Sequence, residues 1–198
     1  MPDKEKKYIK RLKEKLATID DIELSILVNK LINEREELLK SVKLDSLTGV
    51  YNRNVLNEID DFNVVVILDI DNFKAINDTY GHDSGDVALK TISKVLLTNT
   101  RINDYVCRYG GDEFLIIFNG CDLDVVCHRL EKIKMELAKP IRNEDFSITL
   151  SDGIAVREDD ESLEDTITNA DIALYMSKMN GKNQFSIYKK DKTLSLKL

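Results

Sequence analysis

The first 43 residues follow a helical pattern of apolar and polar positions. They contain no glycine, and nearly all of them are good helix formers. Apolar residues recur at spacings of three and four in two stripes, one from Ile9 to Ile19 and one from Leu24 to Val42. The stripes do not share one heptad register, and Asp20-Asp21 lies where they meet. The pattern predicts two helices or one helix with a stutter, which either packs on its own domain or forms a dimerising coiled coil.

Beyond Ser41 the pattern changes to short strands that alternate with helices. The continuous apolar run at 64–68 is rich in β-branched residues, which is typical of a strand buried on both faces. The order of elements predicts an α+β domain with a mainly antiparallel five-stranded sheet flanked by helices. The other expected elements are strands at 105–108, 114–118, 146–156 and 184–188 and helices at 84–98, 123–137 and 163–179.

Gly110-Gly111 lies between the strands expected at 105–108 and 114–118. Paired glycines between apolar strands indicate a hairpin, because the primed turns that close most tight hairpins need positive φ angles. The sequence therefore predicts a hairpin whose tip carries Asp112 and Glu113.

Composition places the chain among globular proteins of a reducing compartment. Apolar residues make up 42% and charged residues 33% of the chain, and no apolar stretch approaches the length of a membrane span. The Lys- and Glu-rich N-terminus lacks the apolar core of a secretory signal. Three cysteines without a C-x-x-C pair, and two histidines, argue against disulfides and a zinc site. We therefore expect a cytoplasmic protein.

The net charge of −7 argues against binding to a nucleic acid polymer, because that binding needs a basic face. It does not exclude a nucleotide substrate. Phosphates are also held by a metal on carboxylates, by backbone N–H groups and by single lysines.

Four acids gather near the ends of the expected strands. Asp69 and Asp71 end the strand at 64–68, and Asp112 and Glu113 lie at the hairpin tip. Residues two apart on a strand face the same side, and hard oxygen ligands together with substrate phosphates are what Mg²⁺ prefers. The alternative for the pair Asp69 and Asp71 is a turn with solvated acids.

Four segments that carry these acids resemble the GGDEF family of diguanylate cyclases, in order and spacing. The resemblance covers about residues 44–190, which leaves the helical segment 1–43 before it and a tail at 191–198. The four segments are Asp45–Arg53 (DSLTGVYNR), Asp69–Asp86 (DIDNFKAINDTYGHDSGD), Arg108–Phe114 (RYGGDEF) and Ala170–Asn183 (ADIALYMSKMNGKN).

The resemblance implies a ferredoxin-like nucleotidyl cyclase fold, related to the polymerase palm. It implies that two GTP molecules, one on each domain of a homodimer, are condensed into cyclic di-GMP and two pyrophosphates. In-line phosphoryl transfer depends mainly on positioning and charge neutralisation. Two Mg²⁺ ions per active site are implied for this work, with Mn²⁺ as an alternative.

The resemblance also assigns catalytic and metal-binding roles. It makes Asp69, Asp112 and the carbonyl of Ile70 metal ligands. Glu113 is either a further ligand or the group that helps to deprotonate the attacking 3′-hydroxyl. Asp112, Glu113 and Lys74 are the residues implied in catalysis.

Phosphate binding is implied for Lys74 and for the backbone N–H groups of Asn72 and Phe73, joined by Lys178 and Lys182. The two later lysines are four residues apart, so they share a face if their helix continues that far. The family often has arginine at the position of Lys182, and a lysine keeps the charge but loses the bidentate fork.

Guanine recognition is implied for Asn77 and Asp86, with His82 between them. A carboxylate accepts from the N1–H and N2–H₂ donors of guanine, whereas adenine lacks this pair and would leave the acid without a donor. Gly110 and Gly111 are expected to let the hairpin approach the nucleotide, because they carry no Cβ.

Arg101 and Asp104 match an Arg-x-x-Asp pattern, which also occurs from Arg142 and from Arg157. Only the first match directly precedes the strand that leads into Gly110, where the family places its inhibitory product site. Arginine suits the O6 and N7 edge of guanine or a phosphate. We therefore expect cyclic di-GMP to bind and inhibit at this pair, the alternative being a surface ion pair of little energetic value.

Two other functions fit the family resemblance. One is a catalytically silent receptor for cyclic di-GMP, although such proteins usually lose residues of the hairpin that is intact here at 110–114. The other is a mixed cyclic GMP–AMP synthase, although that subgroup tends to have a small hydroxyl residue in place of Asp86. An upstream sensor or a partner protein is expected to supply the input signal.

Overall fold

The computed structural model describes residues 3–16, 22–141 and 146–189 of the 198-residue chain. By its internal contacts the chain divides into two compact units, Met1–Leu44 and Asp45–Leu198. The first unit contains helices α1 (Asp3–Leu16) and α2 (Ile22–Lys43), which is the two-helix alternative of the sequence pattern. The junction at Asp20-Asp21 lies outside the described residues. None of the helices in the described part has the length and apolar character needed to cross a membrane.

The second unit is built on a six-stranded sheet in the order β1-β3-β4-β2-β5-β6. The central strand β2 pairs antiparallel with β4 and β5, and β3 pairs antiparallel with β4. The outer pairs, β1–β3 and β5–β6, are parallel. The strands are β1 (Tyr51–Asn52), β2 (Val64–Ile70), β3 (Tyr105–Arg108), β4 (Glu113–Phe118), β5 (Leu150–Val156) and β6 (Phe185–Ile187).

The expected five strands are therefore one too few. The additional strand, β1, has two residues, and a pattern with a period of two cannot be detected over so short a segment. The strand expected at 146–156 begins at Leu150. The mainly antiparallel character of the sheet is confirmed, because three of the five strand pairs are antiparallel.

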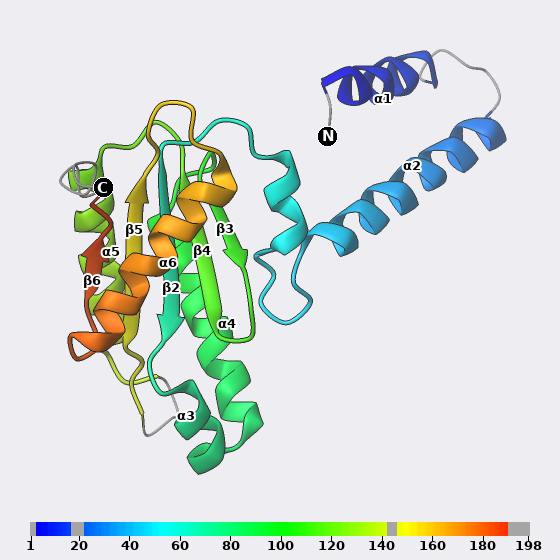
Figure 1. Ribbon diagram of the computed structural model, residues 1–198. Helices are drawn as coiled ribbons and strands as arrows, with labels where there is room; N and C mark the ends of the chain where they lie inside the picture. Colours follow the sequence, from blue (N-terminus) through cyan, green and yellow to red (C-terminus); the bar gives the residue numbers. More distant parts are fainter. Residues whose placement is uncertain (1–2, 17–21, 142–145, 190–198) are drawn as a thin grey trace. The chain divides into compact units, whose positions relative to one another are not determined.

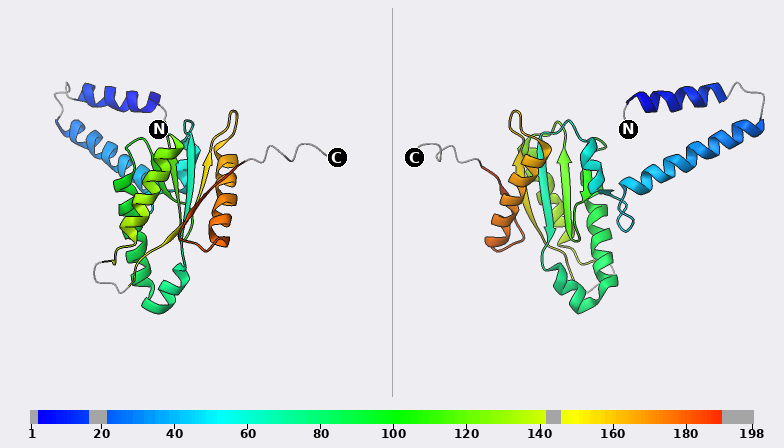
Figure 2. Two further views of the ribbon diagram at one scale, coloured as in Figure 1. Left: turned by 90° about the vertical axis from the view of Figure 1, so that its left-hand side faces the viewer. Right: turned by 45° about the vertical axis from the view of Figure 1, so that its right-hand side comes forward.

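Helices cover both faces of the sheet (Figures 1 and 2). Helices α4 and α5 lie on one face and α6 on the other. The predictions at 123–137 and 163–179 are confirmed to the residue, and the helix expected at 84–98 extends to 82–99. Helix α3, eight residues long, was not predicted. The helices are η1 (Arg53–Glu58, a 3₁₀ helix), α3 (Phe73–Tyr80), α4 (His82–Asn99), α5 (Leu123–Leu137) and α6 (Leu163–Met179).

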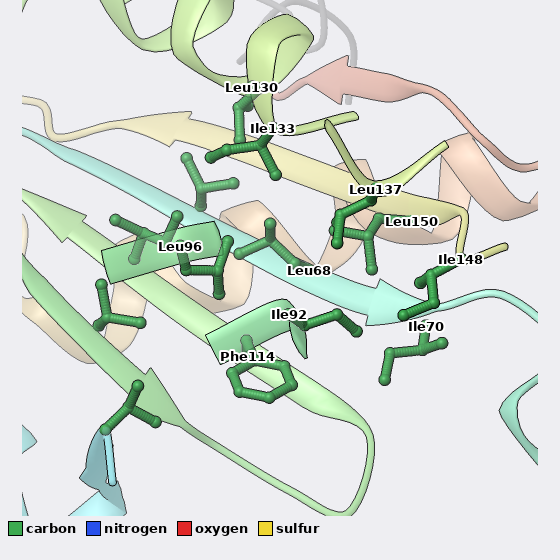
Figure 3. Packing of buried hydrophobic residues seen from close by; sticks show 14 of the residues in the cluster. Leu68, Ile70, Ile92, Leu96, Phe114, Leu130, Ile133, Leu137, Ile148 and Leu150 are labelled. Carbon is green, nitrogen blue, oxygen red and sulfur yellow. The ribbon is translucent and has the colours of Figure 1, made fainter. Parts of the chain in front are cut away.

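The larger part of the core lies between the sheet and helices α4 and α5 (Figure 3). Leu68 of β2 and Phe114 of β4 lie in the same cluster as Ile92 of α4 and Ile133 of α5, all of them fully buried. Burial of each such side chain contributes about 1.5–3 kcal/mol. The cluster anchors the ends of β2 and β4, and these strand ends carry the acids of the predicted site.

Helix α6 lies close against the other face of the sheet, because β5 has a glycine beneath it. A Cβ on Gly153 would lie 2.0 Å from the carbonyl oxygen of Ala170. Val65 and Ile67 of β2 pack in this second cluster with Leu174 of α6. Strand β2 is thus buried on both faces, as its continuous apolar run predicts.

Candidate active site

Asp69 is the next-to-last residue of β2, which lies between β4 and β5 in the sheet. Its Cα partners are Glu113 on β4 and Ser151 on β5. Its carboxylate Oδ2 lies 2.8 Å from Nζ of Lys178, which is near the end of α6. Burial raises the pKa of Asp69, Lys178 opposes that shift, and the charges of Asp112 and Asp71 add to it. The sheet register thus brings an acid cluster and one lysine together at this end of β2.

Glu113 begins β4 and faces the same cluster. Burial raises the pKa of Glu113, and the charges of Asp69 and Asp112 raise it further, whereas Lys178 lowers it. Asp112 precedes it, and the Asp112 carbonyl oxygen accepts from the N–H of Ile70 at 3.3 Å. The predicted metal ligands Asp69, Ile70 and Asp112 therefore meet at one point of the backbone.

The hairpin that carries these acids is closed by residues 109–112. The N–H groups of Tyr109 and Gly110 both donate to the carbonyl oxygen of Glu113, at 2.8 and 3.3 Å. The expected primed turn is wrong, because neither Gly110 nor Gly111 has a φ in the left-handed region. Gly110 lies close to the Glu113 side chain: a Cβ there would lie 2.7 Å from Oε2 of Glu113, so a larger residue would displace that carboxylate.

Arg108 fixes the tip of this hairpin, a role that the sequence did not reveal. Its guanidinium donates to the carbonyl oxygen of Gly111 at 2.7 and 3.1 Å and to Oδ1 of Asp45 at 3.1 Å. Asp45 also accepts from the backbone and hydroxyl of Thr48, and these donors hold the pKa of its carboxyl below the usual value although burial opposes them. The strand-flanking turn at 45–49 is thereby tied to the hairpin.

The predicted phosphate-binding residues lie around the turn that follows β2. Asn72 has a left-handed φ of 57° and precedes α3, whose first turn carries the exposed Lys74. Nζ of Lys182 donates to Oδ1 of Asn72 at 2.7 Å. Helix α6 ends at Met179, before Lys182, so the condition under which Lys178 and Lys182 would share a helix face is not met. Lys178 nevertheless contacts Asp69 on β2, and Lys182 contacts Asn72 on the turn that follows β2.

The predicted guanine-binding residues lie where α3 meets α4. A Cβ on Gly85 would lie 1.9 Å from Oδ1 of Asn77, so a larger residue there would displace the Asn77 side chain. Asn77 therefore lies beside the first turns of α4, which carry the exposed His82 and the half-buried Asp86.

Arg101 and Asp104 lie together in the turn before β3. The Asp104 side chain is 1% exposed, and its Oδ2 accepts from the backbone N–H of Arg101 at 2.7 Å and from Nη1 of Arg129 at 2.9 Å. Arg101 itself is exposed. Arg129, on α5, was not singled out from the sequence. The competing match that begins at Arg142 lies outside the described residues.

Asp71 differs from Asp69 because both of its carboxylate oxygens accept hydrogen bonds from uncharged donors. Oδ1 accepts from the hydroxyl of Ser151, and Oδ2 accepts from Thr149 and from the backbone N–H of Asn183. The side chain is buried. The carboxylate of Asp71 is thus not available to bind a metal. Of the two acids, Asp69 faces the site, and Asp71 is hydrogen-bonded within the protein.

The donor set fits a divalent ion that arrives with its substrate. Within residues 3–16, 22–141 and 146–189, no three or more His, Cys, Asp or Glu side chains are arranged to hold a metal by themselves. Mg²⁺ is usually bound by one or two carboxylates, with substrate phosphates and water completing its shell. Asp69, Asp112 and the carbonyl of Ile70 meet that requirement, and the ion pair of Asp69 with Lys178 shows that this position attracts a cation.

Comparison with known proteins shows the family of this chain. The family model described as the diguanylate cyclase GGDEF domain matches residues 42–184. Diguanylate cyclase DosC of Escherichia coli K12 is 34% identical over 182 residues, which cover 82% of this chain and 40% of DosC. The chain thus spans less than half the length of this relative.

Solved structures give the same result. The coiled coil and GGDEF domain of DgcB from Caulobacter crescentus, in complex with c-di-GMP, has a TM-score of 0.75 at 30% identity, covering 89% of this chain and 98% of that one. Diguanylate cyclase SiaD of Pseudomonas aeruginosa, in complex with its activator SiaC, has a TM-score of 0.70 at 29% identity, covering 93% and 75%. The family match, the relatives and the arrangement of the acids agree, and the chain belongs to the GGDEF domain family of diguanylate cyclases.

Proposed function

We propose that this protein condenses two molecules of GTP into cyclic di-GMP and two pyrophosphates, as a metal-dependent homodimer. The observation that carries the proposal is the convergence of Asp69, Asp112 and Glu113 with Lys178 at the end of β2. DosC, the relative that resembles the chain over 182 residues, is a diguanylate cyclase.

Asp69, Asp112 and the carbonyl of Ile70 are the residues that would hold Mg²⁺ or Mn²⁺. Such ions, when bound, neutralise the charge that develops on the transferring α-phosphate and on the leaving pyrophosphate. The protein's own part is to hold these oxygens still, and it does so through the register of β2 with β4.

Glu113 is proposed either as a further metal ligand or as the group that takes the proton of the attacking 3′-hydroxyl, and its raised pKa supports the second role. Burial and the neighbouring Asp69 and Asp112 charges raise the pKa of Glu113, which increases its affinity for a proton. General bases work best when their pKa lies near the operating pH. The same side chain lies against Gly110, so its position is restricted by the hairpin.

Lys74, Lys178 and Lys182 supply the positive charge for the triphosphate. Lys74 lies in the first turn of α3, where backbone N–H groups at the start of the helix also point outward. Lys178 and Lys182 come from the end of α6 and the loop after it. Binding at these groups holds the α-phosphate in line with the partner's 3′-hydroxyl, and such alignment is the main protein contribution to phosphoryl transfer.

Asn77 and Asp86 read the guanine base, with His82 beside them. A carboxylate at Asp86 accepts two donors that guanine presents and adenine lacks. Gly85, which precedes Asp86, allows α3 and α4 to close on each other, and this closure brings Asn77 to the same place.

Helix α2 supports the homodimer. Leu24, Leu31 and Leu38 recur every seven residues, and Val28 and Val42 occupy the first and third positions of a second seven-residue repeat, whose middle position is Arg35. These three leucines are exposed. β-branched residues at one core position with leucine at the other favour two-stranded parallel coils. Pairing of α2 from two chains would raise the local concentration of the second domain.

Product inhibition is the regulatory part of the proposal. Arg101 is exposed, and its backbone N–H donates to Oδ2 of Asp104, the same oxygen that accepts from the guanidinium of Arg129. Guanidinium groups suit both the phosphates and the guanine edges of cyclic di-GMP. DgcB, a relative by structure, was solved in complex with c-di-GMP.

The input signal is proposed to come from an upstream domain or from a partner protein. SiaD, which resembles this chain over most of its length, was solved with its activator SiaC. The N-terminal unit at 1–44 is the natural receiver of such a signal, because it directly precedes the GGDEF domain in the chain.

The test is incubation of the purified chain with GTP and Mg²⁺, with the products identified by mass spectrometry. We expect cyclic di-GMP and pyrophosphate in a ratio of one to two. ATP alone should give no cyclic product, and an equimolar mixture of ATP and GTP should give mainly cyclic di-GMP. A mixed dinucleotide as the main product would support the synthase alternative, and binding of cyclic di-GMP without any turnover would support the silent receptor.

A further inference from the structure

Asp71 is the most completely bonded acid at the candidate site. Asp71 is the residue directly after β2, and it is 6% exposed. Oδ1 accepts from Oγ of Ser151 at 2.6 Å, and Oδ2 accepts from Oγ1 of Thr149 at 2.8 Å and from the N–H of Asn183 at 3.0 Å. A carboxylate with three donors is strongly held in one orientation.

The three donors come from two separate parts of the chain. Thr149 directly precedes β5 and Ser151 is the second residue of β5, whereas Asn183 lies in the loop between α6 and β6. Asp71 therefore joins the end of the central strand to a loop more than 100 positions later in the sequence. The bond from Asn183 uses its backbone, so it fixes the course of the loop and not only a side chain.

That loop has an unfavourable backbone. Gly181, Lys182 and Asn183 have φ angles of 105°, 63° and 48°, three left-handed residues in succession, two of which carry a Cβ. Each non-glycine residue in this region costs about 1–2 kcal/mol, and such residues persist only where surrounding contacts hold them. The N–H of Lys182 donates to the carbonyl oxygen of Ser177, and the N–H of Asn183 donates to Asp71.

The loop conformation decides where Lys182 reaches. Its Nζ donates to Oδ1 of Asn72 at 2.7 Å, and Asn72 is the residue directly after Asp71. One carboxylate thus holds both ends of this contact, the turn that carries Asn72 and the loop that carries Lys182.

We propose that Asp71 is a positioning residue that locks the 181–183 loop in its left-handed conformation, so that Lys182 is presented to the substrate phosphates above the turn at 72–74. The inference rests on the proposed cyclase function. It gives Asp71 no contact with substrate or metal, because both carboxylate oxygens are occupied by protein donors. Asp71 acts through Lys182.

The test is a double-mutant cycle between Asp71→Ala and Lys182→Ala, with the KM for GTP and kcat as readouts. Each single variant should raise KM about tenfold, with a smaller effect on kcat, since a hydrogen bond to a charged group is typically worth that much. The double variant should be no worse than Lys182→Ala alone, because residues that act through one another are not additive. Additive increases in KM would overturn the inference.

Asp71→Asn is the matched conservative variant. Its amide oxygen can accept from Thr149 and Asn183, and its NH₂ group can donate to Ser151, whose hydroxyl then serves as acceptor. KM should stay within about threefold of the wild type, since all three hydrogen bonds are kept. A loss as large as that of Asp71→Ala would show that the charge matters and not the anchoring. Asp60→Ala, an exposed acid elsewhere, controls for net charge.

A second measurement does not depend on activity. Hydrogen exchange of the Asn183 amide, without nucleotide, should be slow in the wild type and in Asp71→Asn, and at least about tenfold faster in Asp71→Ala. Unchanged exchange in Asp71→Ala would overturn the inference even if activity falls. If Asp71→Ala does not fold, Asp71→Ser takes its place in the cycle with the same expectation, because its shorter side chain keeps a polar group in the buried site but cannot accept from all three donors. A wild type that makes no cyclic di-GMP but shows the exchange pattern would refute the proposed function and leave the loop anchor intact.

Discussion

Nζ of Lys178 lies 2.8 Å from Oδ2 of Asp69, so an ammonium group of the protein itself sits on the carboxylate that the proposed mechanism assigns to a divalent ion. The pair is partly exposed: the Lys178 side chain is 36% and the Asp69 side chain 14% exposed. An ammonium group that neutralises a metal ligand competes with the metal. In the proposed mechanism, the same lysine turns to the phosphates when a nucleotide brings the ion.

Lys178→Ala should therefore bind Mn²⁺ more tightly than the wild type when no nucleotide is present. We expect an increase in affinity of about threefold to tenfold, since one unit charge is removed at contact distance in a partly solvated site. The same variant should show a higher KM for GTP. Electron paramagnetic resonance of free Mn²⁺ at pH 8 measures the first effect.

Lys132→Ala, an exposed lysine on α5, is the control and should leave both values unchanged. Weaker Mn²⁺ binding by Lys178→Ala would mean that the lysine supports the ion instead of competing with it.

Asp112→Ala should abolish product formation while the domain stays folded. The loss of one ligand carboxylate removes both charge and geometry from an electrostatically driven reaction, so a fall in kcat of more than about 100-fold is expected. Asp112 lies in a half-buried turn, so the melting temperature should change little. Turnover close to the wild-type rate would remove Asp112 from the metal site.

Glu113→Gln should stabilise the folded domain at pH 8 although it abolishes activity. The pKa of Glu113 is raised above its ordinary value of 4.5 by burial and by the Asp69 and Asp112 charges. The folded state therefore holds this proton more tightly than the unfolded state. Stability contributed by the protonated acid is present at low pH and is lost as the pH rises from 4.5 through the raised pKa.

Thermal melting of both proteins between pH 4 and pH 8 measures this effect. The advantage of Glu113→Gln should be greatest at pH 8 and should shrink as the pH falls toward 4.5. An advantage that grows toward low pH would contradict the assigned direction of the pKa shift.

Leu31→Lys should weaken the dimer, because it puts a charge among the leucines through which two α2 helices are proposed to pair. Leu31 is 56% exposed in the single chain, so the fold of one subunit does not depend on it. At dilute protein, we expect the specific activity to fall and to become more dependent on concentration. Analytical ultracentrifugation gives the oligomeric state directly.

Ile26→Lys is the matched control, because it adds the same charge to α2 outside the leucine repeat. Ile26 is 65% exposed on the same helix, two residues after Leu24 and therefore on a different face. This variant should dimerise and turn over like the wild type. Equal behaviour of the two variants would show that α2 does not pair through its leucine repeat.

Arg101→Ala should remain active and accumulate more product than the wild type. Arg101 is exposed, and its side chain lies outside the acid cluster at the end of β2. Asp104 keeps its bond from Arg129, so the turn should hold. Progress curves with added cyclic di-GMP should show non-competitive inhibition of the wild type and about tenfold weaker inhibition of the variant, given the loss of one guanidinium contact. A plateau at the same product concentration would place inhibition elsewhere.

Many helices and strands of this protein can be predicted from the residues that they contain. The apolar period of 3.6 fixes the helices at 123–137 and 163–179, and the β-branched run at 64–68 fixes a central strand, because each depends on residues close in sequence. The four segments that resemble the GGDEF family likewise indicate the family from residues within each segment. The two-residue strand β1 and the eight-residue helix α3 are too short to produce such a signal.

The partner of each charged group is decided only by the tertiary structure. Arg108 reaches Asp45 across 63 positions, and Lys182 reaches Asn72 across 110. The sequence presents Asp69 and Asp71 as equivalent acids, yet one faces a lysine and the other is enclosed by three hydrogen-bond donors. A pattern of residue types carries no information about which distant backbone comes within 3 Å. Strand register and the close packing of α6 against Gly153 determine those distances, and with them which acid is available for chemistry and which one holds the site together.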